Sequence, residues 1–152
     1  MTSWTVQKKP DLSMVLNGCL AGLVGITAGA DVVSVSSAVS IGAIAGIIVV
    51  ISVLTIDKLH IDDPVGALSV HLVCGIWGTL AVGLFSSEFN LLAQLAGVAA
   101  AALLCFPVAL GIFYILKKTI GIRVSEQEEL RGLDIGEHSM EAYSGFQIFI
   151  TE

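Results

Sequence analysis

Long apolar runs separated by short polar segments make up most of the chain. Apart from His71, residues 12–30, 32–56, 64–87 and 89–116 carry no Asp, Glu, Lys, Arg or His. Each run is close to or longer than the roughly 20 residues that a helix needs to cross the hydrocarbon of a bilayer. The pattern predicts an all-α fold, a polytopic transmembrane helix bundle. Its four spans lie at about residues 12–30, 35–56, 64–85 and 91–116, so residues 1–116 form a transmembrane region and residues 117–152 a tail.

Composition supports the same class, and the positions of the charged residues predict how the chain is oriented in the membrane. Only 13% of the residues are charged and 55% are hydrophobic, whereas soluble domains carry about 25% charged residues. With four spans, both termini and the loop between the second and third spans share one side of the membrane. That side holds every Lys and Arg of the chain: Lys8, Lys9, Lys58, Lys117, Lys118, Arg123 and Arg131. The positive-inside rule therefore predicts a plasma (inner) membrane protein with both termini in the cytoplasm. The net charge of −6 argues against a nucleic-acid partner.

The first two spans contain glycines spaced one helical turn apart. Such spacing lets helix backbones approach closely in lipid. We expect these glycines to pack neighbouring helices rather than to bind a ligand, and their density suggests a larger bundle than four short-looped spans supply. The glycines are Gly18, Gly22, Gly25, Gly29, Gly42 and Gly46. The three cysteines lie in three different spans, which favours small packing residues over a disulfide or a metal site.

An Asp-Asp-Pro sequence precedes the third span and predicts a helix start. The Asp63 carboxylate is expected to cap the first backbone N–H groups, with Pro64 at the first helical position. Asp62 adds negative charge at the positive end of the helix dipole. These three residues are therefore interpreted as structural rather than catalytic.

His71 is the candidate functional residue of the transmembrane region. An ionisable side chain inside a span is costly unless it faces a pore or a partner. At α-helical spacing it shares a face with mostly small residues: Ala67, Leu68, Cys74, Gly75 and Gly78. A neutral imidazole can both donate and accept a hydrogen bond, which suits a small polar molecule in a narrow pore. The alternative is a structural histidine that is hydrogen-bonded to a neighbouring helix.

The sequence favours neither an enzyme nor a cofactor-binding protein. No second His, Asp or Glu lies three or four residues from His71, so a metal site is not expected. The chain contains no G-x-S-x-G sequence and no glycine-rich phosphate loop. Neither an enzymatic activity nor a cofactor is predicted.

Three motifs resemble the ammonium transporter family (the Amt, Rh and Mep proteins). Residues 15–29, VLNGCLAGLVGITAG, resemble the eighth span of these proteins. The Asp-Asp-Pro sequence followed by Val70-His71 and by residues 74–78, CGIWG, resembles the tenth span. Residues 121–143 resemble the cytoplasmic tail, with the matching positions Gly132, Leu133, Asp134, Glu137, His138 and Tyr143.

The resemblance implies a fold, a substrate and an assembly. The family forms homotrimers of eleven-span subunits in the bilayer, and each subunit has its own hydrophobic pore for ammonium or ammonia with two pore histidines. His71 matches the histidine of the tenth span. The partner histidine, from the fifth span, has no counterpart here, so the chain resembles the eighth to eleventh spans plus the tail. We expect such a C-terminal portion to be unable to transport by itself.

The tail and the isolated bundle each leave an alternative open. In the family the tail packs on the cytoplasmic face, and many members are blocked by a PII-type signalling protein that docks there. The chain could therefore be a membrane-anchored interaction module that binds a PII-type protein or modulates full-length trimers without transporting. An unrelated four-span channel, with histidines paired across protomers, is a third hypothesis. For the tail alone, composition suggests a solvated acidic segment, whereas the ordered match through Tyr143 favours a regulatory tail.

Overall fold

The computed structural model describes residues 1–9 and 11–142. These residues form helices and connecting turns, with no strand among them, so the predicted all-α class is confirmed. Three helical stretches are long and apolar enough to cross a membrane: α3 (Val35–Lys58), the continuous pair η1 (Ala67–Val73) and α4 (Cys74–Phe85), and α5 (Leu91–Thr119). The remaining predicted span, which is the first along the chain, is α2 (Leu12–Thr27). It is apolar but has only 16 residues. The described chain is a partial transmembrane helix bundle.

The ends of the helices differ from the predicted boundaries. α2 ends at Thr27 rather than at residue 30, because the carbonyl of Gly29 accepts the N–H groups of Val32 and Val33 in a turn. α3 continues to Lys58 rather than to residue 56, and α5 continues to Thr119 rather than to residue 116. Lysine side chains can reach toward water from the last turn of a helix, so a charge need not end the helix at that point.

Side-chain caps fix the starts of α2 and α3. Asp11 accepts the N–H of Met14 at 2.9 Å, and Ser34 accepts the N–H of Ser37 at 3.2 Å. Each cap satisfies a backbone donor that has no partner within the helix. The first residues, predicted only as a polar lead, contain the short helix α1 (Thr2–Gln7), which packs against α3.

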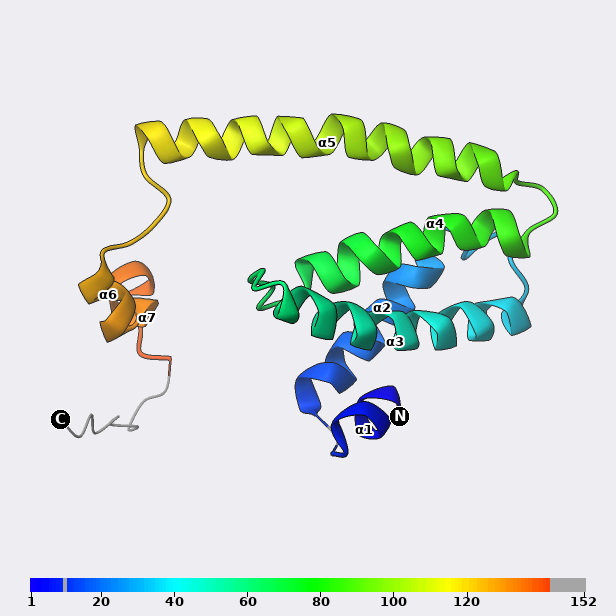
Figure 1. Ribbon diagram of the computed structural model, residues 1–152, viewed down its shortest axis with the longest axis horizontal. Coiled ribbons are helices and arrows are strands. Elements are labelled where there is room, and N and C mark those ends of the chain that lie inside the picture. The colour runs from blue at the N-terminus through cyan, green and yellow to red at the C-terminus, as the bar shows by residue number, and fades with distance from the viewer. Residues whose placement is uncertain (10, 143–152) are drawn as a thin grey trace. The chain divides into compact units, whose positions relative to one another are not determined.

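The core of the first compact unit, residues 1–106, lies between α2, α3 and the η1–α4 pair (Figure 1). Small and β-branched side chains fill it, and those with no exposed surface are Ala21, Ala45, Val49, Ser69, Val70, Cys74 and Ala81. A hydrogen bond from the Cys74 thiol to the carbonyl of Ala45 at 3.8 Å crosses the core, and so does one from the Trp77 indole N–H to the carbonyl of Ile41 at 3.1 Å. Because indole has a single donor, this bond satisfies the ring and fixes its orientation between α3 and α4.

Two glycines set the distance between α2 and α4. A Cβ at Gly78 would lie 2.5 Å from the carbonyl oxygen of Gly25, so only glycine fits at position 78. Gly25 is itself enclosed, since a Cβ there would lie 3.1 Å from Cβ of Ala45 and 3.6 Å from the Trp77 ring. Gly29 is also packed, with Val82 of α4 about 3.5 Å from its Cβ position. Close backbone approach of this kind is the main source of helix attraction in lipid.

The other glycines that were expected to pack lie on open faces of the described chain. A Cβ at each would meet no atom of another helix within 4 Å among the described residues; they are Gly18, Gly22, Gly42 and Gly46. Among the described residues these four positions therefore pack against no helix. Whether they pack against further helices stays a prediction.

The second compact unit, residues 107–152, begins inside α5 at Pro107. Its described part contains the end of α5 and two short helices, α6 (Glu126–Arg131) and α7 (Leu133–His138). Ser125 caps α6 by accepting the N–H of Glu128 at 3.3 Å, and Arg123 forms an exposed ion pair with Glu129 at 3.1 Å. The tail thus contains two short helices, neither of which has a buried residue, and its regulatory role stays a prediction.

Replacing Gly78 by alanine should destabilise the bundle. The added methyl group would collide with the Gly25 carbonyl, and overpacking of this kind costs about 1–3 kcal/mol. Gly75→Ala, in the same helix, is the matched control, because its Cβ would make an ordinary 3.9 Å contact with Val24. We expect SDS titration monitored by circular dichroism to show a lower free energy of unfolding for Gly78→Ala only. Equal stabilities of the two variants would contradict this packing.

Candidate functional site

The third span begins with a π-helix. Gly66 adopts a left-handed conformation at φ 73° and serves as the N-cap of η1. Its carbonyl accepts two N–H groups, from Val70 at 2.8 Å and from His71 at 3.4 Å. The second bond spans five residues, which is the mark of a π turn. Such turns are rare, and many of those that are found lie at functional sites.

Asp63 holds the start of this helix from outside it. One carboxylate oxygen accepts the N–H of Leu68 at 3.0 Å, and the other accepts the N–H of Ser69 at 2.9 Å and its hydroxyl at 2.7 Å. Asp63 therefore satisfies backbone donors as expected of a cap, but it is not the N-cap residue. The prediction that the helix begins at Pro64 is wrong. Pro64 instead follows Asp63 in a turn that the N–H of Gly66 closes onto the Asp63 carbonyl at 3.3 Å.

The electrostatics of Asp63 follow from these contacts. Burial acts to raise its pKa, but the hydrogen bonds from Leu68 and Ser69 outweigh burial and lower the pKa below the ordinary value of 3.8. The carboxylate is thus ionised at neutral pH, and its bonds to the helix are charge-assisted. Asp63 lies before the apolar segment, so this charge stays outside the membrane-spanning part.

His71 is exposed and lines a groove between α4 and α5. We call this the His71 groove. Its volume is about 770 Å³, and the side chains around the imidazole are mostly small or apolar. Gly75, Ile76 and Thr79 line it from α4, and Gly97, Ala101 and Cys105 line it from α5. The Thr79 hydroxyl already donates to the carbonyl of Gly75 at 2.9 Å. The imidazole is therefore the main free polar group of the groove.

The prediction of which residues share a helix face with His71 is only partly correct. Gly75 shares the groove with it, but Cys74 and Gly78 are buried against α2 and α3. The expected face assumed α-helical spacing, and the π turn before Cys74 changes the register of the residues that precede it. Nor does the ring bond to a neighbouring helix: among the described residues no hydrogen bond to the His71 side chain is present.

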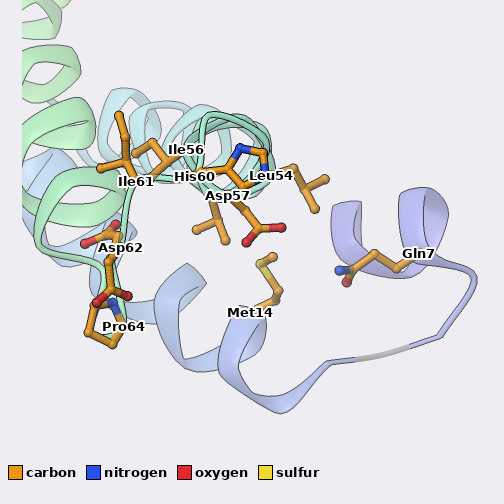
Figure 2. A pocket seen from close by; sticks show the side chains of 11 residues that line it. Gln7, Met14, Leu54, Ile56, Asp57, His60, Ile61, Asp62 and Pro64 are labelled. Atoms are coloured by element: carbon orange, nitrogen blue, oxygen red, sulfur yellow. The ribbon is translucent and has the colours of Figure 1, made fainter. Parts of the chain in front are cut away.

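A second hollow, of about 500 Å³, lies where α3 ends (Figure 2). Asp57, His60 and Asp62 contribute charged or titratable groups to it, and Met14 of α2 and Gln7 of α1 line it as well. His60 lies two residues after the end of α3 at Lys58 and adopts a left-handed conformation at φ 56°. Within the described residues no three His, Cys, Asp or Glu side chains lie close enough to hold a metal ion. Asp62 thus lies in a polar hollow at a helix end rather than along the third span.

In the second unit, the predicted tail residues gather in and around α7. Gly132 is its N-cap at φ 93°, and the helix contains Leu133, Asp134, Glu137 and His138. Asp134 accepts the N–H of Ala142 at 3.1 Å, and this bond and the N–H of Ile135 hold the pKa of its carboxyl below the usual range. This hydrogen bond therefore holds the residues that follow α7 against the first turn of that helix. Tyr143 lies outside the described residues.

Sequence reasoning missed three residues that position the site: Gly66, Ser69 and Trp77. Ser69 is fully buried although polar, and Trp77 bonds across the core. A signal for Gly66 was present, because a glycine between a proline turn and an apolar run is typical of a left-handed residue. The bonding partners of Ser69 and Trp77 depend on the packing of other helices, which no local pattern contains.

The sequence matches the family model described as the Ammonium Transporter Family over residues 1–143. A candidate ammonium transporter of Synechocystis is 47% identical over 134 residues, covering 87% of this chain and 30% of the relative. Ammonium transporter Amt2 of Archaeoglobus fulgidus is 39% identical over 170 residues, covering 99% of this chain and 36% of the relative. Amt1 of Haloferax mediterranei is also 39% identical, over 96% of this chain and 29% of its own length. The chain thus spans about a third of the length of these relatives.

The stabilisation that Asp63 provides should depend on pH. Because its pKa in the folded chain is lowered, its contribution is complete above the ordinary pKa of 3.8 and is lost as the pH falls through the lowered value. The melting temperature of Asp63→Asn should therefore lie below that of the wild type at neutral pH, and the difference should shrink in acid. Asp62→Asn, without a hydrogen bond to η1, should show no such convergence. A difference that is constant with pH would count against the charge-assisted bonds.

Proposed function

The chain belongs to the ammonium transporter family, and we propose that it takes part in moving ammonium or ammonia across a membrane. The observation that carries this proposal is His71, an exposed imidazole in an otherwise small-residue and apolar groove. Its ring can donate one hydrogen bond and accept another. These are the bonds that a small molecule leaving water would need inside the membrane.

In the proposed mechanism, uncharged ammonia is the form that passes His71. Moving an ammonium ion from water into an apolar passage costs several kcal/mol even after relaxation, so ammonium gives up its proton to water before the resulting ammonia enters the groove. The His71 imidazole then replaces the water molecules that ammonia loses. No covalent step is involved, and we propose neither an enzymatic activity nor a cofactor for the chain.

We propose that the pore is completed by further helices. The His71 groove is open, α5 has no buried residue in its described length, and four turn-spaced glycines face no helix of this chain. The relatives are about three times as long as the matched region. An eleven-span subunit assembled as a homotrimer in the plasma (inner) membrane would cover these faces. The distribution of Lys and Arg supports cytoplasmic positions for both termini.

The chain by itself should therefore not transport. Without the helices that close the groove and without a second pore histidine, it lacks a sealed path. Uptake of radiolabelled methylammonium by cells that lack their own transporters should be at background for the 152-residue chain. His71→Ala is the matched control and should be equal to it. Robust uptake by the chain that is lost in His71→Ala would overturn the expectation that further helices are required.

A second candidate function concerns the tail. Residues 120–142 expose apolar side chains between charged ones, among them Leu130 at 79%, Ile135 at 57% and Met140 at 72% relative exposure. Exposed apolar groups with a polar rim are typical of protein interaction sites. We propose that this segment binds a PII-type signalling protein or modulates full-length trimers, as a membrane-anchored interaction module.

Co-purification should test the tail. A PII-type protein should be retained by the detergent-solubilised chain and lost when residues 117–152 are removed. Leu130→Ser with Ile135→Ser should weaken retention, because it removes apolar surface while the charges stay. Arg123→Gln, which breaks only an exposed ion pair worth about 0–1 kcal/mol, should leave retention nearly unchanged. Retention that does not depend on the tail would contradict this second function.

A further inference from the structure

The short helix α1 turns polar side chains toward the protein and apolar side chains outward. Ser3 is buried and Gln7 is half-buried where α1 packs on α3, whereas Met1, Trp4 and Val6 are exposed. Trp4 keeps 62% of its surface exposed and Val6 keeps 54%. A surface helix of a soluble protein has the opposite arrangement, with its apolar stripe against the core. The inversion indicates that the outer side of α1 has apolar surroundings.

The hydroxyl groups of α1 have hydrogen-bond partners within the helix. Ser3 donates to Oε1 of Gln7 at 2.8 Å, and Thr5, which is exposed, donates to the carbonyl of Met1 at 3.2 Å. A hydroxyl without a hydrogen-bond partner is costly away from water. Because both hydroxyls are paired, the outer side of α1 can contact lipid without leaving either donor unsatisfied.

α1 lies at the level where apolar helices give way to charged residues. It packs against α3, and Gln7 points into the polar hollow at the end of that helix (Figure 2). Asp57 and Asp62 line the same hollow, and α3 ends at Lys58. Tryptophan is enriched at this level of membrane proteins, because its ring is apolar while its N–H needs a polar partner. Trp4 is therefore placed as an interfacial side chain.

Basic residues lie beside the apolar side chains of α1. Lys8 and Lys9 follow the helix directly, and both are exposed. Lys58 lies in the last turn of α3, against which α1 packs. The neighbouring carboxylates of Asp57 and Asp62 line the hollow instead. Lysines close to a bilayer surface are attracted to anionic headgroups, so this combination matches the border between acyl chains and lipid phosphates.

We propose that α1 is an interfacial anchor for an anionic bilayer. Trp4 and Val6 insert among the lipids, and Lys8, Lys9 and Lys58 bind the phosphate groups of the headgroups. A second protein helix over the same face would account for the apolar side chains but not for the lysines beside them. The anchor does not depend on the passage of ammonium or ammonia, so it holds or fails independently of transport.

The fluorescence of Trp4, in the full chain reconstituted in lipid vesicles, tests the anchor. The chain has two tryptophans, and Trp77→Phe leaves Trp4 as the only one. In vesicles that contain phosphatidylglycerol, lipids brominated close to the headgroup should quench Trp4 several-fold more strongly than lipids brominated at the chain end. In vesicles of phosphatidylcholine alone, the quenching by headgroup-proximal bromine should be several-fold weaker. Because Trp77 bonds to α3, the difference between the wild type and Trp4→Phe provides the same measurement with an intact core.

Lys8→Gln with Lys9→Gln should lower the quenching in phosphatidylglycerol vesicles to the level seen in phosphatidylcholine. Lys117→Gln with Lys118→Gln is the matched control, because it removes the same charge at the end of α5 and should behave as the wild type. If acrylamide in the water quenches Trp4 as strongly as free tryptophan, α1 lies in water and the proposal is overturned. Lipid quenching that is indifferent to phosphatidylglycerol and to the lysines would also overturn it. A Trp4 that neither quencher reaches would do the same, since a second protein helix would then cover α1.

Discussion

The close approach of α4 to α2 is the contact on which the rest of the structure depends. Gly78 lies directly against the backbone of Gly25, and the Trp77 indole bonds to α3 beside it. In lipid the hydrophobic effect does not drive helices together, so dispersion contacts between closely approaching backbones have to do so. Once α4 is docked in this way, the direction of every side chain from Cys74 to Phe85 is fixed.

The residues at the start of the third span connect the docked helix α4 to the turn that precedes it. The Asp63–Gly66 turn fixes where the chain enters, and the Gly25–Gly78 contact fixes where α4 lies. The intervening residues, 67–73, join these two points as a π-helix. π turns are rare, and at the start of this one the Asp63 carboxylate accepts the N–H groups of Leu68 and Ser69. The irregular turn thereby carries the one imidazole of the span.

Much of the bundle surface contacts no other helix among residues 1–9 and 11–142. α5 is apolar along its length yet has no buried residue, and Gly18, Gly22, Gly42 and Gly46 lie on open faces. Glycine-lined faces have little side-chain surface with which to contact lipid, but they allow helices to approach closely. The relatives are about three times as long as the matched region, and our proposal is that further helices cover these faces.

The sequence by itself determined the helical membrane class and the family, and it predicted the approximate spans and a pore role for His71. These follow from local properties: the length of apolar runs, the positions of charges and the order of motifs. Only the tertiary structure decided that Gly25 and Gly78 form the packed contact, that Asp63 bonds to Leu68 and Ser69, and that η1 is a π-helix. The physical reason is that helix register depends on where the neighbouring helices fix each end of a segment. A periodic pattern assumes regular spacing, so it grouped His71 with Cys74 and Gly78 as well as with Gly75, whereas in the structure only Gly75 of these three lines the groove with it.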